Sequence, residues 1–236
     1  MSGTANVMIS GGTVFGNTAA REGGGLWNST GTLTVSNGTL IQGNVASGDA
    51  ADDGGGGIFN NGGTVIVDGT LATVVISSND ADGILGGGGG IFNLGGTLTV
   101  MKSEITGNFA ERAGGGIEDR NSVGVGITLT DVKLDENEVF GTDVTAPGNG
   151  GGLHVTGSGN VMISGGTVSA NIAALEGGGL WNGLGTMTIT NGTVINGNTA
   201  SGIAADDGGG GIFNNGGALT IDGTTSLVTI SNNTAD

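Results

Sequence analysis

The stretch Gly-Gly-Gly-Leu-Trp-Asn at residues 23–28 decides the fold, because the chain returns to it at regular intervals. The same six residues recur at 177–182, and Gly-Gly-Gly-Ile-Phe-Asn occupies 55–60, 88–93 and 209–214. Degenerate copies, Gly-Gly-Gly-Ile-Glu-Asp and Gly-Gly-Gly-Leu-His-Val, stand at 114–119 and 150–155. A unit that recurs every few tens of residues is the sequence signature of a solenoid, in which each copy forms one rung.

The rungs differ in length but not in their central pattern. The last glycines of successive runs are separated by 32, 33, 26, 36, 27 and 32 residues, so loops absorb the variation. An aliphatic residue always follows the run, and a segment such as Thr32-Leu33-Thr34-Val35 then alternates outward and inward residues. Alternation with β-branched residues is typical of a strand with one buried face.

A third segment places an aliphatic residue three positions before an asparagine, as in Ile41 and Asn44. Three short strands per rung cannot bury their apolar faces alone, so the rungs must stack. We therefore predict an all-β, right-handed parallel β-helix with three short strands in each of about seven to eight rungs.

The asparagines of the third segment form the strongest single column. Aligned on one corner, each amide can bond to the next rung and satisfy polar groups that are costly to bury unpaired. The predicted structural ladder comprises Asn17, Asn44, Asn79, Asn108, Asn137, Asn171, Asn198 and Asn233.

A longer repeat overlies the rungs. Residues 6–82 match residues 160–236 at an offset of 154 positions. We interpret residues 1–236 as one solenoid domain, a fragment of a longer repeat protein whose duplication lengthens a stalk. The first residues, Met-Ser-Gly-Thr-Ala, lack the basic and apolar regions of a signal peptide, so any such signal is expected outside this piece.

The composition of the chain excludes some classes of function and favours another. The net charge is −16 with only five Lys and Arg residues, whereas nucleic-acid binding depends on cations that displace phosphate counterions. No apolar run approaches the length of a membrane span. An acidic chain of 236 residues with 56 glycines and no cysteine is typical of an extracellular bacterial surface protein.

The element Gly-Gly-Gly-Ile-Phe-Asn, followed by Ile-x-Gly-Asn-x-Ala, resembles the repeats of bacterial right-handed β-helix surface proteins. The nearest families are polymorphic membrane protein passenger domains and other autotransporter-like adhesins. Their Phe-x-x-Asn element is altered here, since Val14-Phe15-Gly16-Asn17 keeps the asparagine but shifts the phenylalanine. The resemblance implies a fold and a surface location, and it transfers no functional residue.

The residue after the aliphatic position forms an aromatic column that also accepts Glu118 and His154. Unpaired charge is seldom buried, so we expect this column to point outward as an exposed strip. Such a strip either binds a protein or a glycan, or its rings stack under the long loops that precede the glycine runs. The candidate binding residues are Trp27, Phe59, Phe92, Trp181 and Phe213.

Acidic loops offer a weak metal site. Clustered carboxylates are hard-ion ligands, so Ca²⁺ is the one cofactor the sequence suggests, although the spacing matches no EF-hand. The candidates are Asp49, Asp52, Asp53, Asp206 and Asp207. Asp49 is replaced by Ile203 in the second copy, which favours solvated loop charge.

The remaining charges gather in the fourth and fifth rungs. Alignment of Ile105 on Leu134 stacks Lys102 on Asp131 and Glu104 on Lys133, which predicts two ion pairs rather than a catalytic group. His154 is the only histidine, so a zinc or nucleophile role has no partner in the sequence. We expect no enzyme activity.

The expected function is a non-catalytic structural or adhesive segment of a secreted or cell-surface protein. Its partner would be a host or matrix protein or a glycan. The alternatives are a carbohydrate-binding or lyase-like β-helix, and a subunit that self-assembles end to end into filaments.

Overall fold

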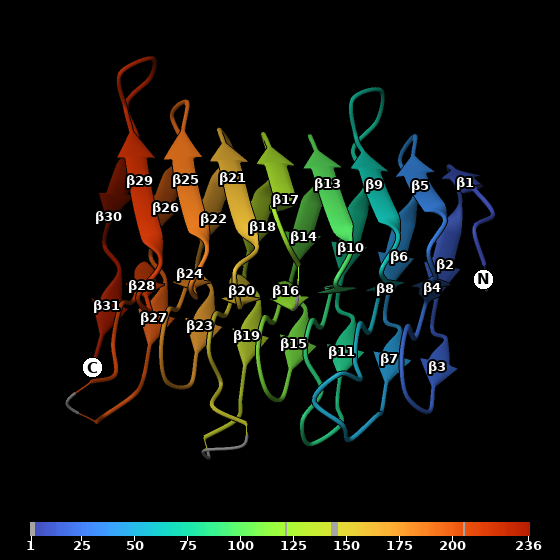
Figure 1. The fold of residues 1–236 in the computed structure, drawn as a ribbon, viewed down its shortest axis with the longest axis horizontal. Helices are drawn as coiled ribbons and strands as arrows, with labels where there is room; N and C mark the ends of the chain where they lie inside the picture. The colour runs from blue at the N-terminus through green and yellow to red at the C-terminus, as the bar shows by residue number, and fades with distance from the viewer. Residues whose placement is uncertain (1–2, 121, 143–145, 205) are drawn as a thin grey trace.

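The computed structural model describes residues 3–120, 122–142, 146–204 and 206–236. All regular elements in these residues are strands, and every strand pair within the sheets is parallel. The strands form four sheets that run the length of a rod (Figure 1). The predicted parallel β-solenoid is confirmed.

Sheet I holds the alternating segments. Its strands are β1 (Val7–Ser10), β5 (Thr32–Ser36), β9 (Thr64–Asp68), β13 (Thr97–Met101), β17 (Val125–Thr130), β21 (Asn160–Ser164), β25 (Thr186–Thr190) and β29 (Ala218–Asp222). Sheet II holds the segments that precede the asparagine column. Its strands are β2 (Thr13–Phe15), β6 (Leu40–Gln42), β10 (Val75–Ser77), β14 (Glu104–Thr106), β18 (Lys133–Asp135), β22 (Thr167–Ser169), β26 (Val194–Asn196) and β30 (Thr229–Ser231).

Sheet III is made of two-residue strands that follow the asparagine. They are β3 (Thr18–Ala19), β7 (Val45–Ala46), β11 (Asp80–Ala81), β15 (Phe109–Ala110), β19 (Glu138–Val139), β23 (Ile172–Ala173), β27 (Thr199–Ala200) and β31 (Thr234–Ala235). Sheet IV follows the glycine runs. Its strands are β4 (Leu26–Asn28), β8 (Ile58–Asn61), β12 (Ile91–Leu94), β16 (Ile117–Arg120), β20 (Leu153–Thr156), β24 (Leu180–Asn182) and β28 (Ile212–Asn214).

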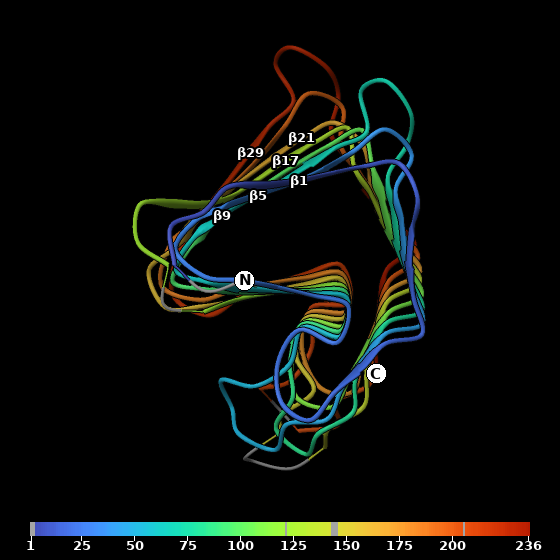
Figure 2. The ribbon, with the colours of Figure 1, turned by 90° about the vertical axis from the view of Figure 1, so that its right-hand side faces the viewer.

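Viewed along the rod, the rungs superpose, and the chain winds clockwise as it recedes from the N-terminus (Figure 2). The winding is therefore right-handed, as the crossover rule for parallel strands predicts. Sheet III is an addition to the prediction of three strands per rung. Its strands are so short that their only trace in the sequence is the alanine that stands two places after every ladder asparagine except Asn137, which Val139 follows.

The core follows from alternation. In β5, Leu33 and Val35 are completely buried while Thr34 between them is half-buried on the outer face. Their register partners in β9, Val65 and Val67, are buried in the same way. Sheets I, II and IV thus line one continuous apolar core along the rod.

The glycine runs allow neighbouring rungs to approach closely. A Cβ on Gly57 would lie 2.6 Å from the carbonyl oxygen of Gly90 and 3.1 Å from the Asn79 side chain. Glycine is required here by lack of space rather than by backbone conformation. The loops that precede the glycine runs form a second lobe, seen below the main ring in Figure 2.

Candidate functional site

The predicted asparagine ladder is continuous. Each Nδ2 donates to Oδ1 of the next member, over 2.8 Å from Asn17 to Asn44 and 2.9 Å from Asn44 to Asn79. The bonds continue to Asn233 at 2.8–3.0 Å. The same Oδ1 also accepts the backbone N–H of the preceding member, so each oxygen joins two rungs. The ladder is a structural device whose interior members are completely buried.

A second ladder runs along sheet IV. Asn28 donates to Asn60 at 2.8 Å, and Asn60 donates to Asn93 at 2.7 Å. After the interruption at Val155, Asn182 donates to Asn214 at 2.6 Å. Sequence reasoning used these asparagines only to mark the repeats, although their fixed place after the aromatic residue was a sufficient signal.

The aromatic column is not an exposed strip, so that expectation is wrong. Phe59 and Phe92 are completely buried, Trp181 is 7% exposed, and Trp27 and Phe213 are half-buried. The column lies on the face of sheet IV away from the main core, where the loops before the glycine runs cover it. This is the covered stack that we named as the alternative.

The rings of this column form a second packing layer. Phe59 and Phe92 pack edge to face at 5.2 Å, and Trp181 stacks on Phe213 at 6.4 Å. The indole N–H of Trp181 donates to Glu176 Oε2 at 2.9 Å, as that of Trp27 does to Glu22. A ligand has no access to the buried rings.

Charged residues replace the rings in the middle of this column. Glu118 is completely buried, and both of its carboxylate oxygens accept hydrogen bonds from Arg112. Burial raises the pKa of Glu118, although Arg112 opposes that rise. His154 Nδ1 lies 3.8 Å from Glu118 Oε1, and its ring is 4.4 Å from that of Trp181. Burial lowers the pKa of His154 well below its usual value, with Arg112 and Arg120 adding to the effect. We predicted that the charge of Glu118 would keep this column on the outside of the protein. That prediction was wrong because Arg112 pairs with Glu118 in the interior.

The calcium candidates do not converge. Asp53 is buried and bonded to Arg21 at 2.9 Å, and Asp49 accepts the backbone N–H of Ile84 at 3.1 Å. Asp207 accepts the backbone N–H of Ala204, while Asp52 and Asp206 are exposed. Within the described ranges, no group of three or more His, Asp or Glu side chains is placed to hold a metal ion.

The two predicted ion pairs are absent, although the predicted stacking is present. Glu104 and Lys133 are register partners in sheet II. Lys133 instead lies 3.7 Å from Asp135 on its own strand, and no ion pair joins Lys102 to Asp131 in the described part of the chain. The stacking places these four side chains around a cavity of about 220 Å³ with Thr73 and Ser103, rather than in direct contact.

The outer face of sheet III presents a different cluster, which we call the acidic-aromatic patch. Its members alternate with buried alanine and valine along three neighbouring chain segments, so they share one face. The patch consists of Asp80, Asp82, Phe109, Glu111, Glu138 and Phe140.

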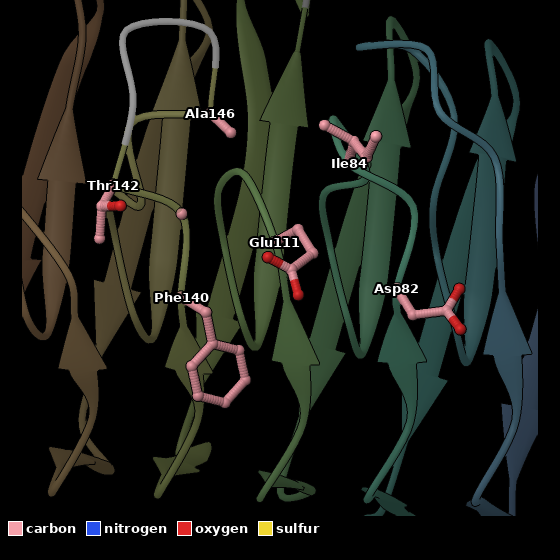
Figure 3. A pocket seen from close by; sticks show the side chains of 7 residues that line it. Asp82, Ile84, Glu111, Phe140, Thr142 and Ala146 are labelled. Atoms are coloured by element: carbon pink, nitrogen blue, oxygen red, sulfur yellow. The ribbon is translucent and has the colours of Figure 1, made fainter.

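The patch borders a cavity of about 340 Å³. Asp82, Glu111 and Phe140 line it from three successive rungs, and Ile84 and Ala146 line it as well (Figure 3). Phe140 is 47% exposed, and its ring stacks on Phe109 with centroids 5.7 Å apart and an interplanar angle of 8°. The sequence carries no repeat signal for this site, because its aromatic residues fall in different columns of the repeat.

The carboxylates of the patch influence one another across neighbouring rungs. Burial, together with the smaller effect of the charges of Asp82 and Glu111, raises the pKa of Asp80 to about 6. Partial burial and like charge therefore both disfavour the ionised form of Asp80.

Comparison with protein families, characterised proteins and solved structures finds no match to this chain. Across the described residues the structure contains no helix that could serve as a membrane span.

Proposed function

We propose that the chain is a non-catalytic, rod-like segment of a secreted or cell-surface bacterial protein. In this role, one side of the rod contacts a partner at a distance from the cell to which the parent protein is attached. The observation that carries the proposal is the uninterrupted asparagine ladder, which locks eight rungs in one register. Because the register is fixed, residues about 30 positions apart in sequence lie side by side on neighbouring rungs, as in the acidic-aromatic patch.

The burial of the charged cluster in sheet IV favours adhesion over carbohydrate cleavage. The group with the strongest acid–base character is Arg112, Glu118 and His154, which are 8%, 0% and 4% exposed. A polysaccharide has no path to these side chains, whereas the patch lies open on one side of the rod. The buried cluster therefore acts in packing, and the patch is the surface available for contact.

The experiment is a binding and turnover assay. The purified chain is applied to immobilised matrix proteins and to a glycan array, and is incubated separately with acidic polysaccharides. We expect retention on at least one surface without cleavage, and loss of retention in the double variant Glu111→Gln/Phe140→Ala. Polysaccharide cleavage, or retention that the double variant leaves unchanged, would contradict the proposal.

A further inference from the structure

We propose that the acidic-aromatic patch binds an organic cation, namely the lysine or arginine side chains of a basic polypeptide. The inference rests on the proposed function, since it names the partner for the contact surface of the rod. Three independent features carry it: the uncompensated charge, the exposed ring pair and the adjoining cavity.

Among the described residues, the charge of the patch has no internal counterion. Four carboxylates share this face, and none of the five Lys and Arg side chains is found among the described residues that line its cavity. Three cations form ion pairs elsewhere in the described residues: Arg21 with Asp53, Arg112 with Glu118, and Lys133 with Asp135. Arg120 donates to the carbonyl of Ala51, and Lys102 lines the separate cavity at the corner of sheets I and II. A bound cation would offset the repulsion from Asp82 and Glu111, which adds to the effect of burial in raising the pKa of Asp80.

The rings specify the kind of cation. Phe140 keeps nearly half of its surface in solvent, and it is held in place by the parallel ring of Phe109. Ammonium and guanidinium groups are attracted to the face of such a ring within about 6 Å of its centre. The aliphatic stem of lysine or arginine would meanwhile lie against Ile84, which also lines the cavity.

The two competing ligands fit less well. A divalent metal needs several oxygens on one point, and no such group of carboxylates is present in the described ranges. A neutral sugar would satisfy the carboxylates by hydrogen bonds but would leave their mutual repulsion in place. An extended basic peptide also matches the spacing. Its alternate side chains lie about 6.6–7 Å apart, within the roughly 10 Å that three adjacent strands span.

The test uses a fluorescein-labelled peptide of alternating lysine and serine, with fluorescence anisotropy as the readout at low and physiological salt. We expect Glu111→Gln and Phe140→Ala each to weaken binding about two- to five-fold, and the double variant about ten-fold. The matched controls are Glu136→Gln and Phe15→Ala, which remove an exposed carboxylate and an exposed ring outside the patch. Each control should change the affinity less than two-fold, and circular dichroism should show that every variant retains the β-solenoid.

Several outcomes would overturn the inference. Equal weakening by the control variants would show general attraction to a chain of net charge −16 rather than a site. Undiminished binding of the lysine-acetylated peptide would show that the cation is not required. Competition by a neutral oligosaccharide would assign the patch to a glycan. If the peptide fails to bind while Glu111→Gln/Phe140→Ala still abolishes retention on matrix surfaces, this inference fails and the proposed function stands.

Discussion

Asn93 donates its side-chain amide to Asp119 Oδ1 over 2.5 Å, and the first stretch of the second ladder ends at this bond. Asp119 occupies the place that asparagine holds in the rungs before it, and its Oδ2 is buried without a hydrogen-bond partner. Burial raises the pKa of Asp119 to about 6, against hydrogen bonds from Ser122 and Asn93 that lower it. The carboxyl group is thus a polar defect inside the rod.

Replacing Asp119 with asparagine should stabilise the chain at neutral pH. The folded pKa of about 6 exceeds the ordinary 3.8, so stability from this group is highest in acid and falls as pH rises through 6. Ionised Asp119 lowers the free energy of unfolding by about 3 kcal/mol at pH 7. An asparagine whose amide lacks a full set of hydrogen-bond partners would recover about 1–2 kcal/mol of this loss. We expect Asp119→Asn to gain about 1–2 kcal/mol at pH 7 in urea unfolding and to lose the pH dependence between 4 and 6. Asp52→Asn, at an exposed site, is the control, and a gain of the same size there would contradict this explanation.

His154 should give pH dependence of the opposite sign. Its folded pKa is depressed well below 6.5, so the unfolded chain binds the proton first, and stability is lost as pH falls below about 6.5. The slope from one such group cannot exceed about 1.4 kcal/mol per pH unit. His154→Phe places a ring against Trp181 and should remove this loss when stability is measured at pH 7 and pH 5 in the Asp119→Asn background. An unchanged slope would mean that another group carries it.

The interior asparagines of the first ladder should contribute more to the free energy of unfolding than the asparagine at its exposed end. Asn108 donates to Asn137 and to the carbonyl of Ile76, and its Oδ1 accepts two N–H groups of Asn79. Asn108→Ala leaves several buried groups unpaired and should lower the free energy of unfolding by about 3–5 kcal/mol. Asn17→Ala, at the exposed first rung, should cost less than about 1 kcal/mol. Equal costs in urea titrations would show that the ladder does not act through burial.

The glycine runs should tolerate no side chain. Gly57→Ala would bring a methyl group to 2.6 Å from the Gly90 carbonyl and should destabilise the chain by about 3 kcal/mol. Gly107 has a φ of +59° and open space around its Cβ position, so Gly107→Ala should cost only about 1–2 kcal/mol of backbone strain. Thermal unfolding of the two variants separates crowding from strain, and the reverse order would contradict the close approach.

Much of this structure was readable from the repeats, because a solenoid repeats its physical constraints. Ile41 and Asn44 fix sheet II and the ladder, since an aliphatic residue and an amide at constant spacing occupy one corner in every rung. The burial of Glu118 was not readable, because it depends on Arg112 reaching across a loop whose conformation the repeat does not specify. The acidic-aromatic patch escaped for a related reason. Phe109 and Phe140 belong to different repeat columns, and only the two-residue strands of sheet III make them neighbours.

The acidic-aromatic patch exists only if sheet III stacks in the observed register, and a cross-link tests this register most directly. Asp80 and Phe109 are register partners on its outer face, while Ala110 points inward. Adjacent strands about 4.8 Å apart suit a disulfide, and the chain has no cysteine of its own. Asp80→Cys/Phe109→Cys should cross-link on mild oxidation, and Asp80→Cys/Ala110→Cys should not. Failure of the first pair, or equal cross-linking of both, would contradict the stacked register and the binding surface built on it.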